Sequence, residues 1–130
     1  MGFTNRNRGK TIYAWLWARL FVRSTFGPLT ARAGGGRALA TALSYGINRV
    51  AVSATAADSV QLPSWVQGAE VLVINDGVAS TQVFGKNGTT DTIDGIATGT
   101  GVPLAAATRC WYYAGDVAGA WLSVKGTKSS

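Results

Sequence analysis

Short runs of alternating apolar and polar side chains fill the chain from residue 48 onward, and turn-forming residues separate these runs. Alternation with a period of two is typical of β-strands that bury one face, and no run in this half repeats with a helical period. Asn75-Asp76-Gly77 and Asp94-Gly95 are examples of the separating turns. The expected strands are residues 49–54, 59–62, 69–74, 81–84, 91–93, 106–113 and 120–124. Short strands at such regular spacing predict a mainly-β domain, an antiparallel β-sandwich or barrel of the jelly-roll type.

Charge divides the chain into two parts. Residues 1–49 hold eight basic and no acidic side chains, whereas residues 50–130 hold four basic and six acidic ones, a net of −2. The formal charge of +6 therefore belongs to the N-terminal part. We interpret residues 1–47 as a basic, aromatic-rich arm, residues 48–126 as the β-domain and residues 127–130 as a tail. Three consecutive glycines, Gly34, Gly35 and Gly36, predict a hinge or linker within the arm.

Residues 10–23 of the arm fit either a helix or an extended strand. As a helix they are apolar around nearly the whole circumference, with Arg19 and Arg23 as a polar edge. As a strand they place large apolar side chains on both faces. Either form leaves aromatic side chains uncovered, so we expect this segment to pack against a partner. The expected partner-binding side chains are Tyr13, Trp15, Trp17, Arg19, Phe21 and Arg23.

Two classes of partner suit this arm. Arginines interleaved with aromatic rings suit nucleic acid, through phosphate contacts and base stacking. The same residue types are the commonest anchors of protein interfaces. Eight large apolar side chains between Ile12 and Val22 exceed what a phosphate-binding tail needs, so a protein partner is favoured over nucleic acid. No membrane partner is expected, because the uncharged run 11–18 is far shorter than the roughly 20 apolar residues of a membrane span.

Few routes to catalysis are open to this chain. It has no histidine and a single cysteine, Cys110, so neither an intrachain disulfide nor a Cys/His metal site can form within one copy. Cys110 lies in a β-prone run and is interpreted as a small buried side chain. Asp91 and Asp94 could form a carboxylate pair for Ca²⁺ or glycoside cleavage, but a third clustered carboxylate is missing, and turn formation is favoured. We expect no enzymatic activity, no cofactor, no metal and no small-molecule substrate.

Three large aromatic residues near the C-terminus, Trp111, Tyr113 and Trp121, have two interpretations. They could form a platform on which sugar rings stack. Large aromatic side chains of small β-domains more often bury area in the core or at a subunit interface, however. Because a domain of about 80 residues has a small core of its own, we expect these three residues at an oligomer interface.

An ordered set of motifs in the β-domain resembles a domain found in structural proteins of tailed bacteriophages. The motifs are Asp58-Ser59-Val60-Gln61-Leu62-Pro63, Gly68-Ala69-Glu70-Val71-Leu72-Val73-Ile74-Asn75-Asp76-Gly77, Val83-Phe84-Gly85, Asp91-Thr92-Ile93-Asp94-Gly95 and Trp121. The resemblance covers residues 48–124, and the order of the motifs is its strongest part. The chain departs from the pattern at Gly85, where Pro is common, and at Asp94, where Asn is common. Both departures keep residues that form turns.

This resemblance implies a virion structural protein, made in the cytoplasm of the bacterial host and placed on the capsid surface. We expect a homotrimeric capsid decoration (cement) protein that stabilises the mature head, with its arm bound to the major capsid protein. A head-fibre or tail-fibre module that binds a receptor is the first alternative. A basic nucleic-acid-binding virion protein is the less favoured one.

Overall fold

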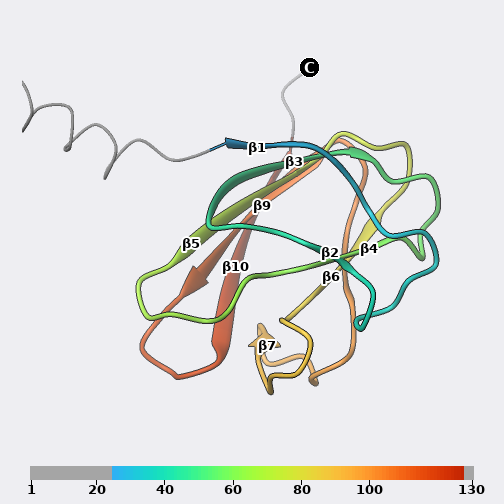
Figure 1. Cartoon of the computed structure of the whole chain (residues 1–130). Helices are drawn as coiled ribbons and strands as arrows, with labels where there is room; N and C mark the ends of the chain where they lie inside the picture. The colour runs from blue at the N-terminus through green and yellow to red at the C-terminus, as the bar shows by residue number, and fades with distance from the viewer. Residues whose placement is uncertain (1–24, 128–130) are drawn as a thin grey trace, which may run out of the picture.

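The computed structural model describes residues 25–127 of the chain, and strands account for all of its regular secondary structure. The strands are β1 (Thr25–Thr30), β2 (Thr41–Ala42), β3 (Gly46–Val52), β4 (Ser59–Gln61), β5 (Glu70–Asn75), β6 (Thr81–Phe84), β7 (Thr92–Ile93), β8 (Val102–Leu104), β9 (Thr108–Ala114) and β10 (Ala120–Thr127). They form two sheets (Figure 1). Both sheets contribute side chains to one common core. The mainly-β class that the period-two runs predict is confirmed.

The two sheets differ in size, and the chain alternates between them. The six-stranded sheet has the order β1-β3-β5-β9-β10-β7, and the four-stranded sheet has the order β2-β4-β6-β8. From β1 to β9, each strand lies in the sheet that the preceding strand does not occupy. When the chain leaves one sheet, forms a strand in the other and returns, its next strand in the first sheet can run in the same direction as its previous one. Accordingly β1, β3 and β5 run parallel to one another, and so do β2, β4 and β6.

The strand pairing is therefore mixed, where the sequence predicts antiparallel pairs. Of the eight strand pairs within residues 25–127, five are parallel and three are antiparallel. Among these strands, β9 and β10 are the consecutive pair that forms a hairpin. Asn75-Asp76-Gly77, a turn that the sequence predicts between two strands, carries the chain from β5 in one sheet to β6 in the other. Alternation along a strand indicates which face is buried but not which sheet the strand joins, so the pairing could not be predicted.

The sandwich begins before residue 48, the boundary that the charge pattern indicates. Strand β1 pairs with β3, and β2 pairs with β4, so residues 25–47 belong to the two sheets. Neither of these early strands shows a regular alternation of buried and exposed side chains, and periodicity therefore misses them. Residues 1–24 and 128–130 lie outside the described part of the chain, and with them all six arm residues from Tyr13 to Arg23.

Gly34, Gly35 and Gly36 form an anchored turn where the sequence predicts a hinge. The amide of Gly34 donates to Asp58 Oδ1 at 3.4 Å, and the carbonyl of Gly36 accepts a hydrogen bond from Ser59 Oγ at 3.0 Å. Gly34 and Gly36 both have φ of +57°, a left-handed conformation that glycine adopts without strain. The glycines therefore allow a tight turn that is fixed onto the four-stranded sheet.

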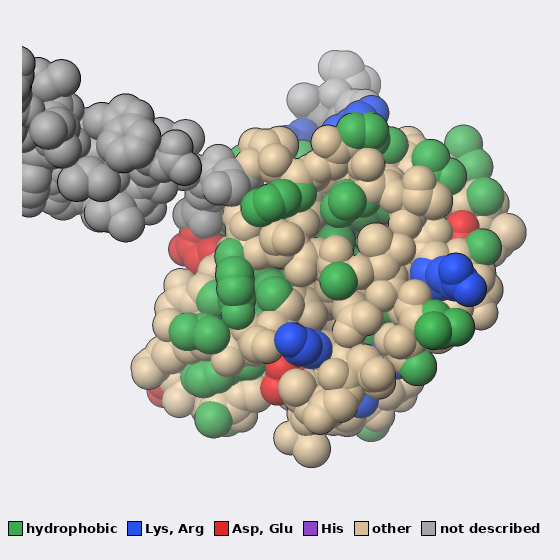
Figure 2. Space-filling model, in the orientation of Figure 1, with side chains coloured by type: hydrophobic (Ala, Val, Ile, Leu, Met, Phe, Trp, Pro, Cys, Tyr) green, Lys and Arg blue, Asp and Glu red, His purple; other side chains and the backbone are tan. Residues whose placement is uncertain are grey.

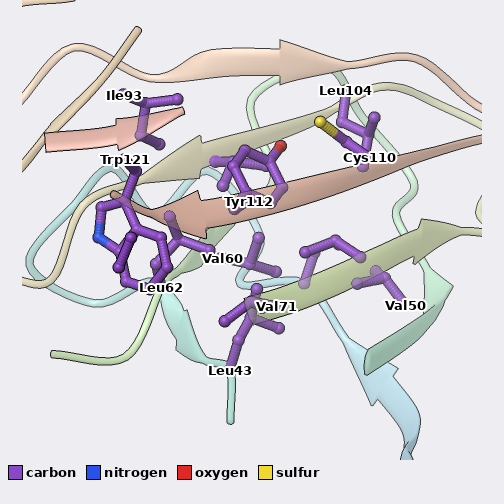
Figure 3. Packing of buried hydrophobic residues seen from close by; sticks show 14 residues of the cluster. Leu43, Val50, Val60, Leu62, Val71, Ile93, Leu104, Cys110, Tyr112 and Trp121 are labelled. Carbon is purple, nitrogen blue, oxygen red and sulfur yellow. The ribbon is translucent and has the colours of Figure 1, made fainter. Parts of the chain in front are cut away.

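Apolar side chains from both sheets meet in one core (Figure 3). The cluster consists of Ala31, Leu43, Val50, Val60, Leu62, Val71, Val73, Val83, Ile93, Leu104, Cys110, Tyr112, Ala114 and Trp121. Trp121 is its largest member and is 0% exposed. Because these side chains come from segments spread over most of residues 25–127, the core forms only when both sheets are assembled.

The connection after β5 depends on a buried asparagine and on close backbone approach. Asn75 is 0% exposed; its Oδ1 accepts from the amide of Gly77 at 2.9 Å, and its Nδ2 donates to the carbonyls of Ala79 and Leu104, each at 2.9 Å. A Cβ atom at Gly77 would lie 2.5 Å from the backbone nitrogen of Ser53. Gly77 is thus required by the lack of space for a side chain.

Candidate interaction surface

Strand β9 separates buried core residues from aromatic residues on the outer side of the six-stranded sheet. Cys110, Tyr112 and Ala114 point into the core and are at most 4% exposed. Trp111 and Tyr113 alternate with them and are partly exposed. Their rings stack with centroids 6.1 Å apart and planes inclined by 22°. The strand thus holds two aromatic rings together on the outer side of the sheet.

The register of the neighbouring strands extends this aromatic pair into a wider apolar area. Trp111 lies opposite Leu72 of β5 and Val124 of β10, and Leu72 in turn lies beside Ile47 of β3. Tyr113 lies opposite Leu122 of β10. Side chains that are opposite each other in a sheet share a face. We call this surface the apolar face, and its members are Ile47, Leu72, Trp111, Tyr113, Leu122 and Val124.

Exposure differs strongly within the apolar face. Leu72 is only 7% exposed, because its register partners on either side are Ile47 and Trp111. Leu122 and Val124 are 54% and 57% exposed. In Figure 2, hydrophobic side chains also lie along the side of the molecule formed by the β4–β5 and β9–β10 connections, where Val66 and Val117 are 54% and 64% exposed. The β10 side of the apolar face is therefore the part that is open to a partner.

Charged residues border the apolar face but do not interrupt its centre. Two residues further along strands β3 and β5 from Ile47 and Leu72, the adjacent row contains Arg49, Ile74 and Arg109. On the other side of the row from Ile47 to Val124, Glu70 lies opposite Tyr113. Arg49 Nε is 2.8 Å from Asp76 Oδ2, an ion pair at the rim of the sheet. The row from Ile47 to Val124 holds no charged side chain across four strands.

The outer side of the four-stranded sheet carries polar side chains and the buried Phe84, and the chain itself partly covers it. Ser59, Gln82 and Pro103 share this side by register. The side chain of Gln82 donates to the carbonyl of Ala56 at 2.9 Å. Ser59 is 0% exposed because the turn at Gly35 lies against it. This side of the molecule is thus closed by its own loops.

A single arginine fixes one of these loops in place. Arg37, between β1 and β2, donates through Nε to the carbonyl of Gly85 at 3.2 Å. Its guanidinium also donates to the carbonyls of Lys86 and Thr89. A guanidinium can bind several carbonyls at once because its N–H groups form a rigid planar fork. Arg37 therefore joins the β1–β2 and β6–β7 connections.

Of the three residues expected at an oligomer interface, the structure brings two together and separates the third. Trp111 and Tyr113 stack on the apolar face, whereas Trp121 is fully buried in the chain's own core. A side chain that is buried within one copy offers no surface to another, so the expectation for Trp121 is corrected to a core role. Leu72, Leu122 and Val124 were missed as surface residues. The signal for Leu72 is the run Val71-Leu72-Val73-Ile74, in which successive residues are all apolar, so that both sides of the strand are predicted to be covered. Leu122 and Val124 are placed on this face by their register with β9.

Asp94 has a structural role in the turn after β7, whereas the Asp91 side chain is buried before β7. Asp94 has φ of +50° in the turn after β7, and its Oδ1 accepts from the amide of Ser123 at 2.8 Å. The Ser123 hydroxyl donates to the other carboxylate oxygen of Asp94. Asp91 is 8% exposed, and its Oδ2 has no hydrogen-bond partner among the described residues. Turn formation, the favoured interpretation of Asp94, is confirmed.

Hydrogen bonding and burial set the protonation of three side chains. The Thr55 hydroxyl, followed by the amides of Ala54, Thr55 and Gly34, lowers the pKa of Asp58 below its ordinary value of 3.8. Burial raises the pKa of the Cys110 thiol, and it raises the pKa of the Tyr112 hydroxyl well above its ordinary value. Cys110 and Tyr112 are therefore neutral at pH 7, and Cys110 is a buried core residue as the sequence predicts.

Comparisons with known proteins give no relative for this chain. No family model, no curated protein and no solved structure matches it. Within residues 25–127, no three acidic or cysteine side chains lie close enough together to hold a metal ion. The described residues also include no helix of the length and apolar character that crossing a membrane requires.

Proposed function

We propose that the protein is a capsid decoration (cement) protein of a tailed bacteriophage, which binds the outer shell as a trimer and stabilises the mature head. The observation that carries the proposal is the ordered set of motifs from Asp58 to Trp121, which resembles a β-domain of phage structural proteins. These motifs include core strands of the sandwich and the turn at Asp94. The proposal assigns the protein to the virion surface after synthesis in the host cytoplasm, and it assigns it no enzymatic role.

The physical basis is mass action on the intact shell. A subunit that binds across joints between capsid proteins stabilises the assembled state, because binding to that state alone shifts the equilibrium toward it. In this proposal the N-terminal segment, with Tyr13, Trp15, Trp17, Arg19, Phe21 and Arg23, contacts the major capsid protein. Trimerisation through the sandwich then multiplies weak single contacts through effective concentration.

The charge distribution supports separate roles for residues 1–24 and for the sandwich of residues 25–127. Residues 25–127 hold six basic and six acidic side chains, so their formal net charge is zero. The excess of +6 divides into +5 in residues 1–24 and +1 at Lys128. Aromatic and arginine side chains that can anchor an interface are thus concentrated in residues 1–24.

A receptor-binding module of a head fibre or tail fibre is the alternative that one specific observation favours. The stacked rings of Trp111 and Tyr113 lie on an outer sheet surface, and sugar rings bind aromatic faces of this kind. The less favoured role, binding of nucleic acid in the virion, draws on the +5 charge of residues 1–24. Affinity for host glycans would support the fibre role, and a steep salt dependence of DNA binding would support the nucleic-acid role.

Co-sedimentation of the full chain with empty heads of the phage that encodes it tests the proposal. Decoration predicts saturable binding and a higher temperature of head disruption. Trp15→Ala and Trp17→Ala should each weaken binding by about thirtyfold, the equivalent of about 2 kcal/mol, if the rings fill pockets on the shell. Neutralising Arg6 or Arg8 should mainly slow association and make binding less sensitive to salt. The reverse ranking, or no binding to heads, would contradict the proposed role.

A further inference from the structure

The apolar face is an extended surface that the described residues leave open on one side. Its central row, Ile47, Leu72, Trp111 and Val124, crosses four adjacent strands, and Leu122 adds a second exposed apolar side chain beside Tyr113. Four strands spaced about 4.8 Å apart make this row roughly 15 Å wide. Continuous apolar patches on soluble domains commonly mark interaction sites.

The edges of the two sheets are poorly suited to strand addition. In the six-stranded sheet the edge strand β1 contains Pro28, and in the four-stranded sheet the edge strand β8 contains Pro103. Proline has no N–H to donate to an added strand. The remaining edges are β2 and β7, which span only two residues each. A contact between copies through a sheet edge is therefore disfavoured relative to a contact through a sheet face.

Charge limits which partner fits the apolar face. Its central row is uncharged, so an acidic or basic partner would lose hydration there without gaining an ion pair. The six basic and six acidic side chains of residues 25–127 cancel, so two sandwiches that approach each other are not opposed by net charge. Another copy of this chain presents both an uncharged apolar centre and a neutral surround.

We propose that the apolar face is the surface through which copies of this chain associate, its occupant being the apolar faces of the other copies where they converge on the symmetry axis. Contact buries Leu122 and Val124, which are more than half exposed in one copy, and it lies beside the partly exposed Trp111 and Tyr113. Aromatic residues at the centre of a patch are the usual anchors of such contacts. This inference deepens the proposed function, since it names the surface by which the decorating oligomer is held.

Light scattering on the full chain and on lysine variants of the exposed positions tests the inference. Leu122→Lys and Val124→Lys should each weaken association on the order of a hundredfold, because they place like charges in an apolar contact. Both side chains are exposed in one copy, so the circular dichroism spectrum should be unchanged. Val78→Lys is the matched control, since Val78 is 86% exposed and lies in the β5–β6 connection.

Cysteine crosslinking identifies the occupant directly. Cys110 is buried, so a Val124→Cys variant carries one accessible thiol among the described residues. It should form disulfide-linked pairs of chains under mild oxidation, whereas Val78→Cys should not. Crosslinking that appears only when Ala14→Cys is also present would show that the N-terminal segment covers the face, and it would overturn the inference.

The remaining outcomes separate this inference from the proposed function. A monomeric wild-type chain, or an oligomer whose mass is unaffected by both lysine substitutions, would overturn the inference whether or not the protein binds heads. A dimer that dissociates in the lysine variants would support the inference and contradict the threefold assembly of the proposed function. An oligomer that dissociates in the lysine variants but never binds heads would contradict only the decoration role.

Discussion

The outer sides of the two sheets differ, although both sheets contribute to the same core. On the four-stranded sheet, Ser59 and Gln82 face outward, and the turn at Gly34, Gly35 and Gly36 lies against the sheet. On the six-stranded sheet, Trp111, Leu122 and Val124 face outward. The chain's own loops thus cover one side of this small sandwich, whereas apolar side chains remain exposed on the other side.

Trp121→Ala should have the largest effect, because it removes the side chain that fills the most space between the sheets. We expect a loss of about 3–5 kcal/mol in the free energy of unfolding, from lost burial and the cavity left behind. Trp111→Ala, on the apolar face, should cost on the order of 1 kcal/mol. Urea unfolding of both variants at one protein concentration measures the difference. Equal losses would mean that core and apolar face do not differ as described.

Arg37→Ala should have the next largest effect, because it releases the β1–β2 connection, which lies against the outer side of the four-stranded sheet. Removing the guanidinium breaks its hydrogen bonds to the carbonyls of Gly85, Lys86 and Thr89. We expect a loss of about 1.5–3 kcal/mol in the free energy of unfolding and faster amide exchange in residues 32–40. Arg37→Lys keeps the charge but not the planar fork, so it should recover only part of the loss. Full recovery would show that charge, and not geometry, holds the loop.

Asp94→Ala should have a smaller effect, on the order of 1 kcal/mol, because it removes the acceptor for the amide and hydroxyl of Ser123. Asp94 also has φ of +50°, which Asp and Asn tolerate better than Ala. Asp94→Asn should therefore retain most of the stability. Thermal unfolding measures both variants, and an equal loss in the two would show that the charge of Asp94 matters more than its turn geometry.

Asp58→Asn should have the smallest effect, because it mainly changes how the free energy of unfolding depends on pH below neutrality. The pKa of Asp58 in the folded chain is lowered from 3.8, mainly by the Thr55 hydroxyl. A lowered folded pKa stabilises the fold above the unfolded pKa, and this stabilisation is lost as the pH falls through the folded pKa. Urea unfolding between about pH 6 and about pH 2 covers the range in which a carboxyl titrates. Over this range the free energy of unfolding should fall more steeply with decreasing pH in the wild type than in Asp58→Asn. Parallel pH profiles would indicate that Asp58 does not contribute.

The sequence predicts part of the interaction surface. Trp111 and Tyr113 are identifiable by residue type, whereas Leu122 and Val124 become surface residues only through their register with β9. Trp121 shows the limit of this reasoning, because a tryptophan in a strand suits a core and an interface equally well. Its position between the sheets, and not its residue type, places it in the core.

Local patterning predicts most of the strands from residue 48 onward and the turn at Asp94, because period-two alternation and turn chemistry act over a few residues. It misses β8, whose three residues Val102–Leu104 are too few to show an alternation. The tertiary structure decided what depends on distant contacts. It brought β1 and β2 into the sheets, made five of the eight described pairs parallel, and turned the three glycines into an anchored loop. The physical reason is that hydrogen bonds between strands join residues far apart in the chain, and alternation along one strand carries no information about its neighbour.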